Sequence, residues 1–263
     1  MVKTISKRII RLLATGLIGS VLFWCPAGAQ SEPTVAEALV RAQQARLPDS
    51  VVIQVMGQAL DAGFGRSSAA RTIMVLAEAH QADFDLNPFR DRIEEGIAKR
   101  IEGPRIAAAL ETRLQRQMLV RNRLPHDKDT DAAVYQAAVV SLSDALEMGL
   151  TPQEVGALVQ RAGEAPVAMT AVAGEMWALL KQLNFAPVLT DRVISEGLAL
   201  QAFHPAWRNF PQIVVMARQK GVPDEATATE ALQSLQTGGA PADLLIRLGF
   251  TGRNLRTGPM GDK

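Results

Sequence analysis

Helix start and stop signals recur along almost the whole chain, and no stretch shows the alternation of apolar and polar residues that marks a half-buried strand. Thr34 and Glu37 have the spacing of a capping box, and Thr151 and Glu154 repeat it with a proline at the first helical position. Together with several well-placed glycines, these signals predict about twelve short helices, which start near residues 34, 50, 67, 88, 104, 130, 152, 166, 189, 206, 224 and 240.

Apolar residues also fall at helical spacing. Ile106, Leu110, Leu114 and Met118 step by four residues along one face of a predicted helix. Alanine is frequent and aromatic residues make up only 5% of the chain, a composition typical of closely packed helices with short connections. We therefore expect an all-α fold.

The chain contains an internal repeat. When the sequence is shifted by 101 residues, segment 81–104 lies over segment 182–205 without a gap. Seven positions then carry identical residues, namely Gln81/Gln182, Phe84/Phe185, Ile93/Ile194, Glu95/Glu196, Gly96/Gly197, Ala98/Ala199 and Pro104/Pro205. The repeat predicts two duplicated helical units, either stacked as in a solenoid or packed as a compact bundle.

Gly96 and Gly197 occupy equivalent places inside predicted helices. Glycine inside a helix costs about 0.5–1 kcal/mol relative to alanine. Its presence in both units predicts a close helix–helix contact at each position.

The repeat suggests boundaries along the chain. Segment 122–131 is polar and charged, which favours a linker between the units, and Val222-Pro223-Asp224 resembles the helix start at Leu47-Pro48-Asp49. The expected division is a leader over 1–29, helical unit 1 over 30–121, the linker over 122–131, helical unit 2 over 132–221, a partial third unit over 222–249 and a disordered tail over 250–263.

The N-terminal leader has the pattern of a cleavable signal peptide. Four basic residues and no acidic one precede an apolar stretch over 12–24, and Ala27 and Ala29 are small residues at the positions that signal peptidase recognises. The alternative is an uncleaved anchor, but the apolar stretch would extend only about 20 Å as a helix, short of a hydrocarbon core of about 30 Å. We expect cleavage after Ala29 and a periplasmic or secreted protein.

The only cysteine, Cys25, lies within this leader. Trp24 precedes it where a lipoprotein signal requires a small residue, so we expect no lipid anchor. The mature chain would be free of cysteine, which excludes disulfides, a thiol nucleophile and a cysteine-ligated zinc site.

The charge of the mature chain is close to balanced. Of the 28 Lys and Arg residues, four belong to the leader, which leaves 24 against 27 Asp and Glu. This balance indicates neither a nucleic-acid-binding nor a membrane-surface protein. No window beyond residue 30 is apolar enough to span a bilayer.

One acidic segment has the ligand spacing of a calcium-binding EF-hand loop. Oxygen-bearing side chains stand at its ligand positions, namely Asp83, Asp85, Asn87, Asp91 and Glu94. The sixth position requires the sharp turn of a glycine, but it holds Pro88, whose φ is fixed. We therefore expect no metal or other cofactor, and interpret Asn87 as the cap of a helix that Pro88 begins.

Glu95 and Glu196 are helical carboxylates at equivalent positions of the two units. One could act as the general acid of an envelope hydrolase, but catalysis requires a single carboxyl group in a special pocket rather than the same residue in each unit. The three histidines are far apart in the sequence, without metal-ligand spacing. Structural roles are the favoured interpretation, and we assign no catalytic residue.

Arg105, Arg116 and Arg123 share one stripe of a predicted helix, opposite its Ile106–Met118 face. Such a stripe is usually a solvated face, but these arginines are weak candidates for contact with an anionic partner.

Four aromatic residues in the second half of the chain favour core or inter-unit packing, with a small apolar ligand pocket among them as an alternative: Trp177, Phe203, Trp207 and Phe210.

The function favoured by these features is that of a non-enzymatic interaction module that binds an envelope protein or polymer. Two alternatives remain: a binding protein for a lipid or apolar small molecule, and a hydrolase with a helical carboxylate. The sequence does not indicate an oligomeric state or the identity of any partner.

Overall fold

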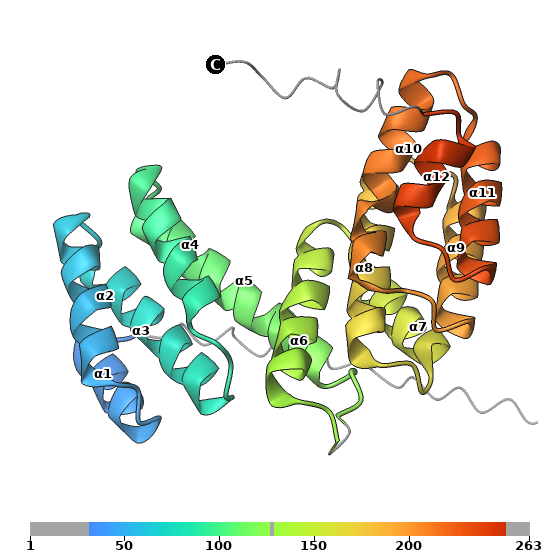
Figure 1. The fold of residues 1–263 in the computed structure, drawn as a ribbon. Helices are drawn as coiled ribbons and strands as arrows, with labels where there is room; N and C mark the ends of the chain where they lie inside the picture. The colour runs from blue at the N-terminus through green and yellow to red at the C-terminus, as the bar shows by residue number, and fades with distance from the viewer. Residues whose placement is uncertain (1–31, 127–128, 251–263) are drawn as a thin grey trace, which may run out of the picture. The chain divides into compact units, whose positions relative to one another are not determined.

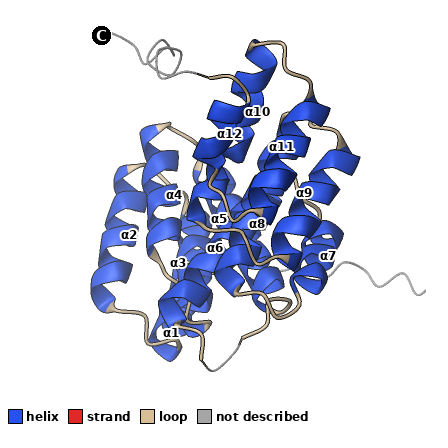
Figure 2. Ribbon diagram, turned by 45° about the vertical axis from the view of Figure 1, so that its right-hand side comes forward, coloured by secondary structure: helices blue, strands red, loops and turns tan. Residues whose placement is uncertain are grey.

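The computed structural model describes residues 32–126 and 129–250, and all regular structure in these ranges is helical (Figures 1 and 2). The predicted leader and residues 251–263 of the predicted tail lie outside them. The helices are α1 Val35–Gln44, α2 Asp49–Asp61, α3 Arg66–Gln81, α4 Asn87–Ala98, α5 Gly103–Arg121, α6 Ala132–Glu147, α7 Pro152–Ala162, α8 Val167–Gln182, α9 Pro187–Ala199, the 3-10 helix η1 Pro205–Asn209, α10 Phe210–Gln219, α11 Asp224–Gln236 and α12 Pro241–Arg247. The prediction of an all-α fold with about twelve helices is confirmed for this part of the chain.

Both predicted capping boxes are formed. At the start of α1, the Glu37 backbone N–H donates to Thr34 Oγ1 (3.2 Å) and the Thr34 N–H donates to the Glu37 carboxylate (2.8 Å). Thr151 and Glu154 make the same two bonds at α7, at 3.1 and 2.6 Å. Each box satisfies two backbone donors that the first helical turn leaves without an intrahelical acceptor.

Two helix starts differ from the prediction. Asn87 is the first residue of α4 rather than its cap, and its backbone N–H donates to Asp85 Oδ1 at 3.0 Å. The helix expected near residue 206 begins instead as the 3-10 turn η1, and α10 follows from Phe210. Prolines near the start of both η1 and α10 explain the interruption, because a proline nitrogen is tolerated only where no helical hydrogen bond is required.

The helices pack mainly against neighbours one or two places away in the chain. Contacts join α1 to α3, α3 to α5, α5 to α6, α6 to α8, α8 to α9 and α9 to α11. In Figure 1 these helices follow one another in the order of the colours, from α1 in blue to α11 in red. One hydrophobic core extends from Ala38 in α1 to Leu244 in α12.

The junction of α5 with α6 includes Tyr135. Its hydroxyl donates toward the backbone carbonyl oxygens of Arg121 and Leu124, each at 3.3 Å, and its ring lies edge-on to His126 with centroids 4.3 Å apart. The side chain therefore holds the segment after α5 against the start of α6.

Phe203, Trp207 and Phe210 form a buried aromatic cluster, with centroids 5.9 Å apart for Phe203 and Trp207 and 6.0 Å for Trp207 and Phe210. These three side chains are almost fully excluded from solvent, as expected for core packing. Trp177 differs, because it is only partly buried.

The two repeated glycines lie against bulky neighbours. A Cβ atom on Gly96 would lie 2.6 Å from Ile106 Cδ1 of α5, so the predicted close approach of two helices is found there. On Gly197 it would lie 2.2 Å from Cζ of Phe203, which belongs to the segment after α9 rather than to another helix.

Helix bounds and backbone conformations recur at the spacing of the sequence repeat. α3 and α8 each have 16 residues, and their bounds differ by 101. The residues two places beyond them, Asp83 and Asn184, have φ of 57° and 51°, and Arg100 and Gln201 have φ of 56° and 50°. These matches support the proposed duplication, which stays a prediction.

Candidate functional site

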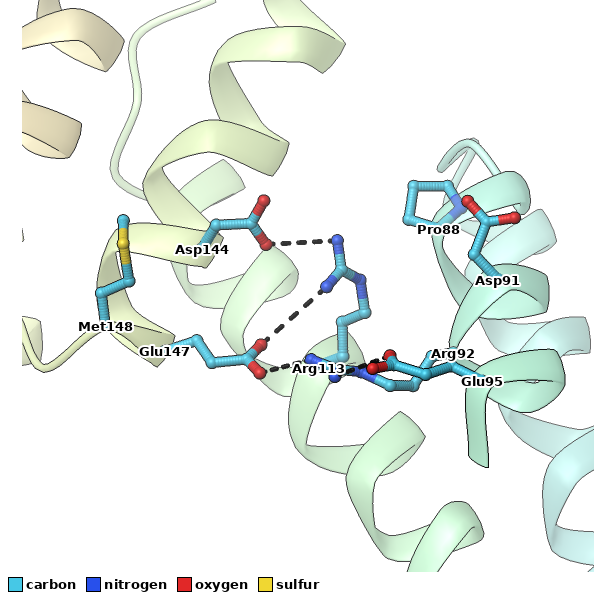
Figure 3. Close-up of a pocket in the computed structure, with 8 residues that line it drawn as sticks. All are labelled: Pro88, Asp91, Arg92, Glu95, Arg113, Asp144, Glu147 and Met148. Carbon is cyan, nitrogen blue, oxygen red and sulfur yellow. Dashed lines mark hydrogen bonds and ion pairs between the residues drawn. The ribbon is translucent and has the colours of Figure 1, made fainter. Parts of the chain in front are cut away.

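A charged groove lies between α4 and α6, with α5 at its base. It consists of two adjoining hollows of about 430 and 470 Å³ that share Pro88 and Asp144. Figure 3 shows the first hollow, with Pro88, Asp91, Arg92 and Glu95 on one side, Asp144, Glu147 and Met148 on the other, and Arg113 between them. The second is lined further along by Asp85, Ala133, Gln136, Ala137, Val140 and Ser141. We call the whole the α4–α6 groove.

Glu147 is the centre of an ion-pair network in this groove. Its carboxylate pairs with Arg92 of α4, with Arg116 Nη1 of α5 at 3.3 Å and with Arg113 Nη1 of α5 at 3.9 Å. Arg113 Nη2 also lies 3.2 Å from Asp144 Oδ1. These pairs connect three helices and fix the spacing of the charges along the groove.

Arg113 is the most buried member of the network. Its side chain is 10% exposed, its guanidinium lies 6.0 Å from the centre of the buried Phe89 ring, and its Nε has no hydrogen-bond partner among the described residues. Arg113 is buried because it lies on the apolar side of α5, only about 20° around the helix axis from Ile106. The Nε donor is itself shielded from solvent, so Arg113 acts in the groove through its Nη groups, which pair with Asp144 and Glu147.

The carboxylates of the groove differ in their environments. Burial raises the pKa of Asp144, although the charge and hydrogen bond of Arg113 act in the opposite direction. Across the groove, a hydrogen bond from Lys99, together with the charges of Lys99 and Arg92, lowers the pKa of Glu95. General acid catalysis requires a carboxyl group that keeps its proton, and Glu95 does not meet this requirement.

Two contacts near the ends of the groove join α6 to α4 and to the segment before α4. At one end Arg92 pairs with Glu147. At the other, the Gln136 side-chain amide donates to the Asp83 carbonyl oxygen at 2.8 Å. The side chains that line the groove from this side run at helical spacing from Ala133 in α6 to Met148 at its C-cap, over about 22 Å along the helix.

The three arginines of the predicted stripe have different surroundings. Arg116 pairs with Glu147, so it belongs to the groove network rather than to a solvated face opposite the core. Arg105 is exposed and lines a small hollow beside Lys99 and Ile106. Arg123 is exposed just after α5, and its Nε would lie 3.6 Å from a Cβ atom added to Gly156 of α7.

The repeated carboxylates make different contacts. Glu95 pairs with Lys99 at 2.5 Å and with Arg92 at 3.3 Å on its own helix. Glu196 accepts a hydrogen bond from the Gln236 amide at 3.0 Å, which joins α9 to α11. The two equivalent glutamates therefore have different roles in the two units.

The residues with EF-hand spacing do not gather around one point. Asp85 accepts the backbone N–H of Asn87, and Glu94 accepts a hydrogen bond from Gln58 of α2 at 3.2 Å. Across residues 32–126 and 129–250, no group of three or more His, Cys, Asp or Glu side chains is placed to hold a metal ion. In the same ranges, no helix has the length and apolarity needed to cross a bilayer.

Sequence reasoning missed the groove residues Arg113, Asp144 and Glu147. A helical projection of α5 shows the pattern that would have identified Arg113. Arg113 and Gln117 both lie within about 20° of Ile106, whereas Met118 lies about 120° away. A charged residue on the buried face of a helix indicates an internal ion pair or a binding site.

The chain was compared with models of protein families, with curated proteins and with solved structures, and none of the three comparisons gave a significant match.

Proposed function

We propose that the protein is an exported helical-repeat interaction module, and that it binds a basic polypeptide segment of another envelope protein in the α4–α6 groove. The observation that carries the proposal is the groove's excess of carboxylates over guanidinium groups. Its lining contains Asp85, Asp91, Glu95, Asp144 and Glu147 against Arg92 and Arg113, and Arg116, which pairs with Glu147, raises the number of guanidinium groups only to three.

The acidic groups that would meet such a segment are available. In the described part of the chain neither Asp85 nor Asp91 forms an ion pair, and both are exposed. The arginines of the groove are already paired with Glu147, Asp144 or Glu95. An acidic surface raises the association rate of a basic partner and disfavours an acidic one.

The groove geometry also suits a chain rather than a compact molecule. Its two hollows adjoin along one face of α6, and small residues such as Ala133 and Ala137 line one half. A polypeptide segment could place Lys or Arg side chains beside Asp85 and Asp91 and still contact the apolar wall at Val140.

Export is part of the proposal, and it rests on the leader pattern before Gln30. Hydrolysis is not proposed, because both carboxylates beside Arg113 are held by that guanidinium and Glu95 has a lowered pKa.

The test measures binding of two labelled peptides by fluorescence anisotropy, one of alternating Lys and Ala and one of alternating Glu and Ala. The protein is purified from the periplasm, and mass spectrometry checks that its first residue is Gln30. We expect the Lys peptide alone to bind, with an affinity that falls as salt is raised. Asp91→Lys is expected to weaken binding about fivefold, because an exposed charge contact contributes up to about 1 kcal/mol.

Asp61→Lys is the matched control, since Asp61 is also an exposed helical aspartate but lies at the end of α2 and does not line the groove. This control should bind like the wild type. Equal binding of both peptides, or equal loss in the two variants, would show that the groove is not the site. A protein retained from envelope extract by wild type and by Asp61→Lys, but lost with Asp91→Lys, would identify the natural partner.

A further inference from the structure

A separate hollow lies between α7, α8 and α9, and none of its lining residues lines the α4–α6 groove. Its volume is about 590 Å³, within the range of about 300–1,000 Å³ that is usual for small-molecule sites. Its lining is Glu154 of α7, Trp177 and Lys181 of α8, and Asn184, Phe185, Pro187, Val188, Thr190 and Asp191 at and before the start of α9. We call it the α7–α9 hollow.

Every charged side chain in this lining already has a partner of opposite charge. Lys181 Nζ lies 2.8 Å from both carboxylate oxygens of Glu154, and Asp191 pairs with Arg161. A charged ligand would therefore have to compete with these pairs, whereas an uncharged one leaves them in place. The α4–α6 groove differs, because its lining includes Asp85 and Asp91, which form no ion pair within the described ranges of the chain.

The remaining lining is largely apolar. Trp177 is only partly buried, and the Arg161 guanidinium, 5.5 Å from its ring centre, helps to hold it in position. Phe185 is 2% exposed, whereas Val188 is 72% exposed at the start of α9. A single exposed valine is ordinary, but this one adjoins a tryptophan and a proline around a hollow.

Trp177 and Val188 of this hollow have no exposed apolar counterparts in the first half of the chain. At the 101-residue spacing, Trp177 matches Leu76, which is fully buried, and Val188 matches Asn87. Phe185, by contrast, matches the buried Phe84. The phenylalanine thus recurs as a packing residue, whereas Trp177 and Val188 are not required by packing alone.

We propose that the α7–α9 hollow binds an uncharged alkyl or acyl chain, which contacts Trp177 and Val188. The chain could come from a free molecule or from a membrane lipid, and both offer the same apolar chemistry. This site is independent of the groove, so either proposal can fail without the other.

The test uses quenching of tryptophan fluorescence by a brominated chain. The protein is the chain from Gln30, which contains the whole compact unit and only two tryptophans, Trp177 and the fully buried Trp207. Bromododecanol with bromine on its terminal carbon is the free probe, and phosphatidylcholine vesicles with brominated acyl chains are the membrane probe. We expect saturable quenching by bromododecanol, and we expect Trp177→Phe to abolish it.

Val188→Asp places a carboxylate at the hollow and is expected to weaken binding about tenfold, because that charge would be desolvated by the chain. Ile53→Asp is the matched control, since Ile53 is 71% exposed on α2, and it should bind like the wild type. Quenching by both probes assigns the ligand to lipid, and quenching by the alcohol alone assigns it to a free molecule. The proposal would be overturned if neither probe quenched the tryptophan fluorescence, or if quenching were undiminished in Trp177→Phe. It would also be overturned if Val188→Asp and Ile53→Asp weakened binding equally.

Discussion

Replacement of Gly197 by alanine tests how closely the buried aromatic cluster approaches α9. An added Cβ would lie 2.2–2.6 Å from three atoms of the Phe203 ring, well inside van der Waals contact. Phe203 is 1% exposed and packs against Trp207 at a centroid distance of 5.9 Å, so its ring has little room to move. The methyl group therefore overpacks the core.

The expected magnitude follows from two opposing effects. Overpacking a core typically costs about 1–3 kcal/mol, and the severity of this overlap favours the upper end. Alanine in place of a helical glycine returns about 1 kcal/mol. The net loss in the free energy of unfolding is about 2 kcal/mol, which corresponds to a fall in Tm of about 4–8 °C for a domain of this size.

Gly57→Ala in α2 is the matched control, because in the described part of the chain nothing beyond the adjacent residues and the α2 backbone lies within 4 Å of the position its Cβ would take. That variant should gain about 0.5–1 kcal/mol. Both are measured by urea and thermal unfolding of the chain from Gln30. If Gly197→Ala proved as stabilising as Gly57→Ala, the reasoning would be refuted. Phe203→Leu provides an independent check, since combining it with Gly197→Ala should cost less than the sum of the two single changes.

Two further predictions concern a cap and a carboxylate. Thr151→Ala removes the capping box of α7 and should lower the free energy of unfolding by about 0.5–2 kcal/mol, whereas Thr229→Ala, at an exposed threonine that makes no cap, should change it little in urea unfolding. Because burial raises the pKa of Asp144 above its ordinary 3.8, its contribution to stability is fully present below that value and is lost as pH rises through the raised pKa. The difference in unfolding free energy between wild type and Asp144→Asn should therefore fall as pH rises above about 3.8, and a difference that rises over the same range contradicts the assignment.

Local signals predicted the helices well because capping and helix termination depend on nearby residues. The Thr34 and Thr151 boxes form as expected, and most helices begin within two residues of the predicted start. The exception is the interrupted start at η1 and α10. There, the placement of two prolines and the burial of Trp207 and Phe210 decide the backbone, and burial depends on contacts that the sequence does not display.

The groove was harder to predict because it depends on which residues share a face over several turns. A step of four residues drifts about 40° per step from the helical repeat, so Met118 leaves the core face and is 41% exposed. Arg113 and Gln117 occupy that face instead. Arg116 lies about 80° around the helix axis from Ile106, and there it pairs with Glu147 of α6. The pairing of α5 with α6 is a tertiary contact that no local pattern contains.

The position of Tyr135 gives the molecule a built-in optical reporter. It is the only tyrosine in the chain, and its hydroxyl is held by the carbonyl oxygens of Arg121 and Leu124 where α5 passes to α6. Burial raises the pKa of this phenol, although the charge of Arg121 opposes the shift. Any ultraviolet signal of phenolate formation therefore comes from this one residue, and the pH at which it appears reports whether the Tyr135 hydroxyl is still buried against the segment after α5.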